Sequence, residues 1–294
     1  MLSKGSVGTR VFRSLNGLFL IIVALICVFP FIHIVALSFS GSAQAQAGLV
    51  KFWPVGFTLA SYQYVMNRAA FWRSFIITLE RVVLGGGVNM LLVIMLAYPL
   101  SKEVNQFKAR TFYVWFLFVT VLFNGGIIPL YMLISQLKLL NSIWALVLPS
   151  AVPVFNVVLM INFFRQIPRE MEEAAYIDGA SHWKILLKIF LPVSMPSIAT
   201  IALFTIVGHW NSWFDGLMFM NRLEKLPLQS YLQTVIINTD MSSKNPDDWK
   251  ILSFISDRTL KSAQLVLATI PILMVYPFLQ RYFVTGIVLG SVKG

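Results

Sequence analysis

Residues 173–192 read EAAYIDGASHWKILLKIFLP, a short polar segment that leads into an apolar, proline-containing run. Long apolar runs precede and follow it, so it interrupts a pattern that otherwise resembles a series of membrane spans. A Glu-rich segment in such a place is where a membrane protein would meet a soluble partner. This stretch therefore decides how the rest of the chain is interpreted.

The residues around this stretch predict a short helix that ends at Gly179. Pro168 suits the first turn, where its missing N–H is not needed. Glu170, Glu172 and Glu173 follow in that turn, where negative charge complements the helix dipole. Gly179 is a natural left-handed terminator about eleven residues later.

At about 100° per residue the predicted helix has two different faces. The face of small side chains, which permits close approach to a groove in a partner, comprises Met171, Ala174 and Ala175. The opposite face is polar and comprises Glu172, Glu173 and Tyr176. From periodicity alone, an ordinary surface helix between two spans explains the pattern equally well.

The composition of the chain is that of a membrane protein. The 294 residues are 57% hydrophobic and 12% charged, and the mean hydropathy is +0.76. Soluble domains carry roughly 25% charged residues. Runs of about 20 apolar residues can cross the hydrocarbon core of a bilayer. The expected spans are 15–38, 74–100, 111–136, 143–164, 194–218 and 263–282.

The first apolar run could be mistaken for a secretory signal, because Ala43-Gln44-Ala45 mimics a cleavage site. The run from Leu15 to Leu37 is, however, longer than the roughly 7–15 residues of a signal-peptide core. More spans follow it, so we interpret it as a retained transmembrane helix. The polar segment 219–262 is expected to be an external loop with one short helix.

The charge distribution sets the expected orientation. The net charge is +11, but the cations are dispersed, which argues against nucleic-acid binding and for cations that flank membrane spans. The short segments 1–14 and 101–110 are rich in cations, whereas 137–142 carries only Lys138. Both termini and the segment 165–193 are therefore expected on the cytoplasmic side. The single cysteine, Cys27, excludes an internal disulfide and a cysteine-based metal site.

The pattern Glu173-Ala174-Ala175, Gly179 and Ile189-x-Leu191-Pro192 resembles the EAA loop of permease subunits in ATP-binding-cassette (ABC) importers. Further motifs are similar to those of a carbohydrate-permease subgroup: Phe123-Asn124-Gly125-Gly126, Asn141 with Trp144-Ala145-Leu146, and Trp210-Asn211-x-Trp213-Phe214. The terminal stretch from Gln280 to Gly294 is similar to the tail of maltose-type inner subunits. The likeness covers nearly the whole chain.

This resemblance implies an all-α polytopic membrane protein with six transmembrane helices and the type I ABC importer permease fold, in which residues 1–294 form a single transmembrane domain. It implies as partners a second homologous permease, an ABC ATPase dimer and an extracytoplasmic sugar-binding protein. ATP and Mg would be bound by the partner ATPase, so this chain would be no enzyme and hold no cofactor or metal. The residues that the resemblance assigns to ATPase coupling are Met171, Glu173, Ala174, Ala175, Asp178 and Gly179, with Ser291, Val292 and Lys293 at the tail. The implied location is the bacterial inner (cytoplasmic) membrane.

Polar and aromatic groups inside the spans are the expected pathway residues. They are His209, Trp210, Asn211, Trp213, Asn124 and Asn156. The tryptophans could stack on sugar rings, or they could form a belt at the membrane interface. Glu80 and Arg81 either snorkel to the outer surface or line a pore.

The substrate implied by the resemblance is an oligosaccharide, with pectin- or alginate-derived sugars suggested by the subgroup. Within ABC importers the alternative is a permease for amino acids or short peptides. An intramembrane enzyme would need a catalytic constellation, and the sequence contains none that we recognise. A transporter that works alone would need an internal repeat and an ion-coupling acid, and the sequence lacks the repeat.

Overall fold

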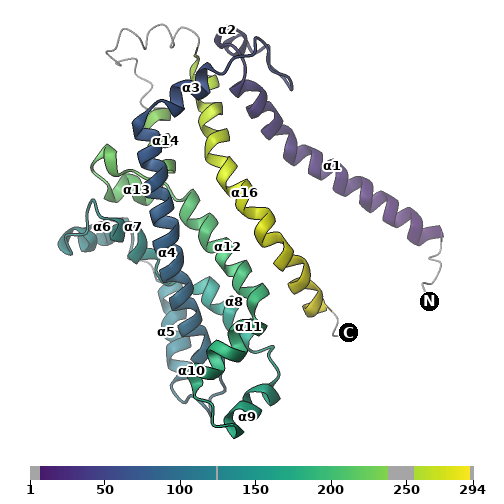
Figure 1. Cartoon of the computed structure of the whole chain (residues 1–294), viewed down its shortest axis with the longest axis vertical. Helices are drawn as coiled ribbons and strands as arrows, with labels where there is room; N and C mark the ends of the chain where they lie inside the picture. Colours follow the sequence, from purple (N-terminus) through teal and green to yellow (C-terminus); the bar gives the residue numbers. More distant parts are fainter. Residues whose placement is uncertain (1–6, 124, 238–254, 292–294) are drawn as a thin grey trace. The chain divides into compact units, whose positions relative to one another are not determined.

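The computed structural model describes residues 7–123, 125–237 and 255–291, and all regular structure in these ranges is helical (Figure 1). The longest helices are α1 (Val7–Ser38), α4 (Ala69–Ser101) and α16 (Asp257–Ser291). The middle of the chain contains α5 (Arg110–Leu122), α6 (Ile127–Gln136), α7 (Ile143–Val147), η1 (Leu148–Ser150), α8 (Val154–Phe164) and α9 (Arg169–Ile177). It continues with α10 (His182–Ile185), the π-helical turn η2 (Leu186–Phe190), α11 (Leu191–Val193), α12 (Met195–Asn211), α13 (Phe214–Phe219), η3 (Leu223–Lys225) and α14 (Leu228–Ile237). Two short helices, α2 (Ser42–Gln46) and α3 (Ala60–Met66), lie between α1 and α4.

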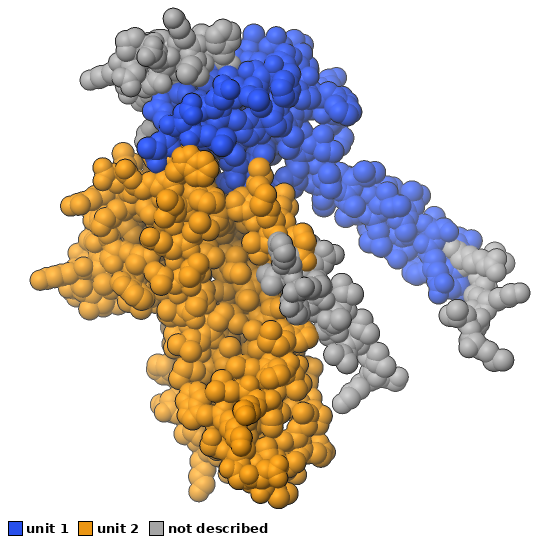
Figure 2. Space-filling view, in the orientation of Figure 1, with its two compact units in different colours: residues 1–69, 236–269 blue, residues 70–235, 270–294 orange. Residues whose placement is uncertain are grey.

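The chain divides into two compact units, which Figure 2 colours separately. Unit 1 comprises residues 1–69 and 236–269, and unit 2 comprises residues 70–235 and 270–294. In unit 1 the end of α1 packs on α2 through a small apolar cluster of Ala36, Ala45 and Val50. The apolar side chains along the rest of α1 are exposed, as expected for a helix whose partner is lipid or another chain.

The core of unit 2 lies where α4, α8, η2 and α12 meet. Its fully buried side chains include Val93, Ala97, Val157, Met160, Ile185, Phe190 and Ile201. These residues recur on one face of each helix, which is the spacing that allows helices to bury an apolar stripe against one another. This core supports the segment from α9 to α11.

Three of the expected spans are broken helices. Residues 111–136 form α5 and α6 instead of one helix, because Gly126 adopts the left-handed φ of +89° just before α6. Residues 143–164 form α7, η1 and α8, with a bend of 50°. Pro153 stands at the N-cap of α8 and cannot supply the N–H that a continuous helix would need.

The expected span 194–218 begins as helix α12 but is broken before its expected end. The helical run His182–Val193 and helix α12 meet at an angle of 82°, in a region where Pro192 and Pro196 both lack the donor for a continuous helix. Helix α12 ends at Asn211, and α13 is a separate helix. In the described residues three helices are long and apolar enough to cross a membrane, or up to six if each bent pair is one span.

The long segment after α13 is only partly described. It contains η3 and α14, a helix of 10 residues, in agreement with the expected short helix. Its polar stretch 238–254 lies outside the described residues. Helix α16 includes the expected span 263–282 and extends beyond it at both ends.

Candidate functional site

Helix α9 ends as the sequence predicts and begins one residue later than predicted. Pro168 is its N-cap, one position before the first turn, and Glu170 and Glu172 lie in that turn. Gly179 has a φ of +71°. Its N–H bonds the Tyr176 carbonyl at 3.0 Å, and the Ala180 N–H bonds the Ala175 carbonyl at 2.9 Å. This pair of bonds is the Schellman arrangement, which requires the left-handed conformation that glycine adopts without strain.

The two predicted faces of α9 are wrong at Ala175 and Glu172. Ala175 packs against the core of unit 2 and the Glu172 side chain is largely buried, so both face inward. The outward face carries Met171, Ala174 and Ile177, and Ile177 is 87% exposed. The inward turn of Glu172 depends on a partner in another element, which helix periodicity cannot reveal.

That partner is Lys102, the residue directly after α4. The Lys102 ammonium lies 2.6 Å from Glu172 Oε1, and the two side chains are only 7% and 12% exposed. The ammonium also lies 4.2 Å from the ring centroids of both Tyr98 and Phe190. A carboxylate and two aromatic faces together replace the water that burial removes from this cation.

Tyrosine and histidine side chains extend this cluster. Tyr176 donates its hydroxyl proton to Glu172 Oε1 at 2.8 Å. His182 Nδ1 lies 3.0 Å from the Tyr176 oxygen and 3.2 Å from the Tyr98 oxygen. We call Tyr98, Lys102, Glu172, Tyr176 and His182 the Lys102 cluster. It connects the end of α4 with α9 and α10.

Lys102 and Tyr176 of this cluster have shifted pKa values. Burial lowers the pKa of Lys102, and the bond to Glu172 opposes that shift. Burial raises the pKa of Tyr176, and the neighbouring Glu172 carboxylate raises it further. The tyrosine therefore keeps its proton for donation at neutral pH.

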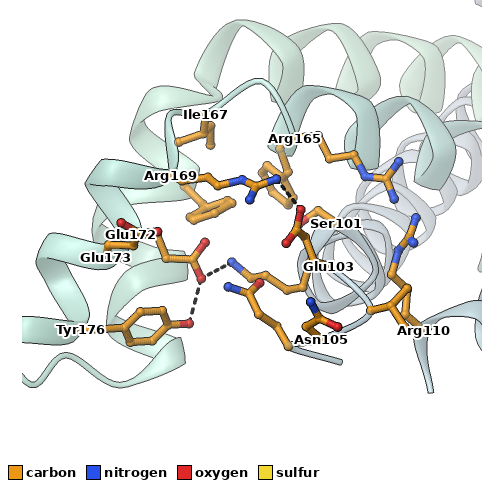
Figure 3. A pocket seen from close by; sticks show the side chains of 15 residues that line it. Ser101, Glu103, Asn105, Arg110, Arg165, Ile167, Arg169, Glu172, Glu173 and Tyr176 are labelled. Carbon is orange, nitrogen blue, oxygen red and sulfur yellow. Dashed lines mark hydrogen bonds and ion pairs between the residues drawn. The ribbon is translucent and has the colours of Figure 1, made fainter. Parts of the chain in front are cut away.

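A cavity of about 690 Å³ opens between α9 and the α4–α5 loop (Figure 3). Its lining is mainly polar and includes Ser101, Arg110, Arg165 and Glu173. At its rim Arg169 forms an ion pair with Glu103, and both side chains are exposed. Helix α9 thus presents an apolar outward face next to a cavity with a charged lining.

A second polar cluster lies inside the apolar helices of unit 2. Arg81 is 2% exposed and pairs with Asp215. Its Nε donates to His209 Nδ1 at 3.5 Å, which leaves the His209 Nε2 proton to donate to Asn89 Oδ1 at 2.5 Å. The Asn89 amide donates to the Ser150 carbonyl at 2.6 Å. We call Arg81, Asn89, His209 and Asp215 the Arg81 cluster.

Arg81 was expected to snorkel or to line a pore beside Glu80. It does neither in unit 2, because it is enclosed and bonded to α12 and the start of α13, whereas Glu80 is exposed. The close approach of α4 and α12 depends on Gly85, where an added Cβ would lie 2.6 Å from His209 Cε1. The sequence does contain the partner, Asp215, four residues after Asn211. An ion pair between residues as far apart in the chain as Arg81 and Asp215 leaves no periodic pattern in the sequence.

The expected pathway residues do not form one surface. Trp210 is buried and packs edge-on against Phe75, with ring centroids 5.8 Å apart. Asn156 is buried and donates to Thr205 Oγ1 at 3.3 Å. Asn211 and Trp213 are exposed.

Some predicted residues cannot be placed. Asn124, Val292 and Lys293 lie outside the described residues, and of Ser291 only its position as the last residue of α16 is described.

Broken apolar helices around the polar segment α9 are the features expected of a membrane permease. The chain belongs to the family described as "Binding-protein-dependent transport system inner membrane component", which matches residues 5–288. It is therefore a transmembrane component of this class of transporter and not itself a catalytic subunit.

Individual relatives extend this family assignment. The chain is 41% identical to Protein LplC of Bacillus subtilis (strain 168), with 97% of this chain and 96% of that protein covered. It is 38% identical to the polygalacturonan/rhamnogalacturonan transport system permease protein YtcP of the same organism, over 97% and 99%. A crystal structure of a bacterial ABC transporter involved in the import of the acidic polysaccharide alginate matches with a TM-score of 0.84 and 32% identity, covering 95% of this chain and 99% of that chain.

Proposed function

We propose that this chain is a permease subunit of an ATP-driven importer for oligosaccharides, in which it forms half of the translocation pathway. The observation that carries the proposal is the match along nearly the whole chain to permeases whose names specify oligosaccharide or polysaccharide transport. The same names count against the alternative of an importer for amino acids or short peptides.

The partners follow from this role. They are a homologous permease, an ABC ATPase dimer that holds ATP and Mg, and an extracytoplasmic sugar-binding protein. Helix α9 is the docking element, because it is short, ends in a glycine turn and presents an apolar face to solvent. The docking residues are Met171, Glu173, Ala174, Asp178 and Gly179, with Ile177 added from its exposure. Ala175 supports this face from behind.

The membrane arrangement is part of the proposal. Each bent pair of helices counts as one span, which gives six spans with both termini and α9 in the cytoplasm. Three of the expected pathway residues, His209, Trp210 and Asn156, bond or pack between helices. Asn211 and Trp213 are the two that remain available to a sugar or to an interface.

The substrate class is an acidic oligosaccharide of the polygalacturonan, rhamnogalacturonan or alginate type. This choice rests on the relatives named for polygalacturonan/rhamnogalacturonan and for alginate. Arabino-oligosaccharides are a second choice, supported by a permease of Halalkalibacterium halodurans that is 29% identical over 283 residues.

The test is ATP hydrolysis by the complete complex in lipid nanodiscs with its binding protein. The added ligands are oligogalacturonate, oligoalginate, an arabino-oligosaccharide, trialanine and glutamine. Stimulation by one sugar class alone supports the proposal and identifies the substrate. Stimulation by trialanine or glutamine alone would refute the sugar assignment, and failure of any ATPase to bind the chain would refute the permease role.

A further inference from the structure

We propose that Lys102 is a positioning residue that locks the docking helix α9 to the end of helix α4, so that a movement of α9 displaces α4 directly. The inference rests on the proposed function, since it assigns a route for coupling within that transporter. Peptide connectivity already joins α9 to α10 and, beyond it, to α12. The contact through Lys102 adds a second route into the membrane helices.

The first argument is the enclosure of the Lys102 side chain. It is held by Glu172 from α9, by the ring of Tyr98 from α4 and by the ring of Phe190 from η2. A cation with such partners on three sides cannot move away from Glu172 without losing its only carboxylate. Because Lys102 directly follows α4, a displacement of Glu172 pulls on the last turn of that helix.

The second argument is that Glu172 is fixed in turn. Tyr176, one turn later on α9, donates to the same carboxylate oxygen, and Figure 3 shows Glu172 and Tyr176 projecting from α9 toward this contact. Because the Tyr176 hydroxyl donates its proton to Glu172, the Tyr176 oxygen accepts a hydrogen bond from His182 Nδ1. Helix α9 is thus held by Lys102, directly after α4, and by His182 of α10.

The third argument is where α4 leads. Its buried residues recur every four positions, from Ala97 through Val93, Asn89 and Gly85 to Arg81. This stripe contacts the core of unit 2 at Val93 and Ala97, and it contains Asn89 and Arg81 of the Arg81 cluster. A shift of the α4 end therefore acts on packed contacts along the whole helix.

The structure also supplies a matched control. A second ion pair, Arg169 with Glu103, joins α9 to the loop after α4, but its side chains are 69% and 51% exposed. Exposed pairs contribute little, whereas breaking one partner of an enclosed pair is costly. Glu103→Gln and Lys102→Gln each remove one charged bond between the same two elements, and only the second removes the enclosed one.

The experiment uses the complete transporter in proteoliposomes, with the oligosaccharide that stimulates the wild-type complex. Three quantities are measured for wild type, Lys102→Gln, Lys102→Arg and Glu103→Gln: co-purified ATPase, ATP hydrolysed and oligosaccharide accumulated. The decisive quantity is oligosaccharide transported per ATP hydrolysed, because a loss of stability alone lowers both rates together.

We expect Lys102→Gln to retain its ATPase and to transport about fivefold less oligosaccharide per ATP, or a larger reduction. Lys102→Arg keeps a cation for the ion pair and for the ring contacts, so its ratio should fall less than that of Lys102→Gln. Glu103→Gln should stay near wild type. An unchanged ratio in Lys102→Gln, or an equal fall in Glu103→Gln, would overturn the role of Lys102.

A neutral double variant covers the case in which Lys102→Gln does not assemble. Lys102→Met combined with Glu172→Gln leaves no unpaired charge in the enclosed contact, so it should assemble. A reduced transport ratio in this variant supports the proposal, and a wild-type ratio overturns it. If the wild-type chain itself binds no ATPase, the proposed function fails and the coupling role with it, which is a different result from an assembled complex with an unchanged ratio.

Discussion

Gly179 shows how a single residue determines where helix α9 ends. Its φ of +71° is left-handed, and a Cβ added there would meet no atom within 4 Å. A side chain at this position is therefore opposed only by backbone strain. We expect Gly179→Val to cost about 1–3 kcal/mol at the end of α9, and to weaken co-purification of the ATPase or its coupling to transport while membrane insertion stays normal.

Gly48 provides the comparison for this variant, since it also has a left-handed φ, of +70°, and open space around it. Gly48→Val imposes the same strain far along the chain from the docking segment. Gly179→Asn should behave nearly as wild type, because asparagine tolerates this conformation. Full transport by Gly179→Val would contradict the role of this turn.

Gly85 is the second glycine whose lack of a side chain matters. An added Cβ would lie 2.6 Å from His209 Cε1, whereas at Gly86 the nearest atom, Thr205 Cγ2, would be 3.9 Å away. We expect Gly85→Ala to destabilise the protein by about 1–3 kcal/mol through overpacking. Gly86→Ala should be neutral or slightly stabilising, because alanine favours the helix. Thermal unfolding in detergent compares the two, and equal melting temperatures would contradict the close packing of α4 on α12.

The contrast between Gly179 and Glu172 explains what could be predicted at this scale. Each end of α9 depends on residues within one turn of it, so Gly179 predicted its end correctly, and the proline and glutamates predicted its start to within one residue. The orientation of Glu172 depends on Lys102, 70 residues earlier in the chain. Such a contact leaves no pattern in the local sequence, so the predicted polar face was wrong.

At the scale of elements, the apolar runs predicted where helices occur but not where they break. Glycines and prolines are common in membrane helices, where many are tolerated without a break. Pro30 and Pro99 lie inside the long helices α1 and α4, whereas Pro153 precedes the start of α8. Which proline ends a helix depends on whether neighbouring elements supply the missing bonds, and this information is not local.

The contact between α4 and the α12–α13 corner depends on the Arg81–Asp215 pair. Arg81 is 2% exposed, so Asp215→Asn would leave a buried guanidinium without its carboxylate. We expect this variant to lose about 3–5 kcal/mol of stability. The measurement is the melting temperature of the purified chain in detergent, compared with that of Glu224→Gln.

Glu224 is the appropriate reference because it pairs with Arg73, also on α4, at 4.0 Å with both side chains largely exposed. Loss of this pair should change stability by less than about 1 kcal/mol. Replacing both partners of the enclosed pair, as Arg81→Met with Asp215→Leu, should recover part of the loss. Similar melting temperatures for Asp215→Asn and Glu224→Gln would show that the enclosed pair does not stabilise this corner.

At the scale of the whole molecule, composition and the docking motif together predicted an all-helical permease, and the family match and the similar solved structure confirm it. The contacts of the expected pathway residues were harder to predict. His209 and Asn156 were selected because they are polar and lie within spans, but polar groups in a membrane also bond neighbouring helices. In unit 2 both of them do so.

The orientation of the whole chain gives the last prediction. In a Cys27→Ser background, in cells that lack the ATPase subunit, single cysteines at Ile177 and Leu223 would both be accessible to reagents, since these side chains are 87% and 70% exposed. With α9 in the cytoplasm and the segment 219–262 outside, a membrane-impermeant maleimide added to intact cells should label Leu223→Cys and leave Ile177→Cys unlabelled. Labelling of Ile177→Cys should appear only after the membrane is opened. The reverse pattern would invert the topology and remove α9 from the side on which ATP is hydrolysed. Equal labelling of both cysteines in intact cells would place an even number of membrane crossings between residues 177 and 223. The bent run from η2 to α12 should supply one crossing, so that result would contradict the proposed arrangement.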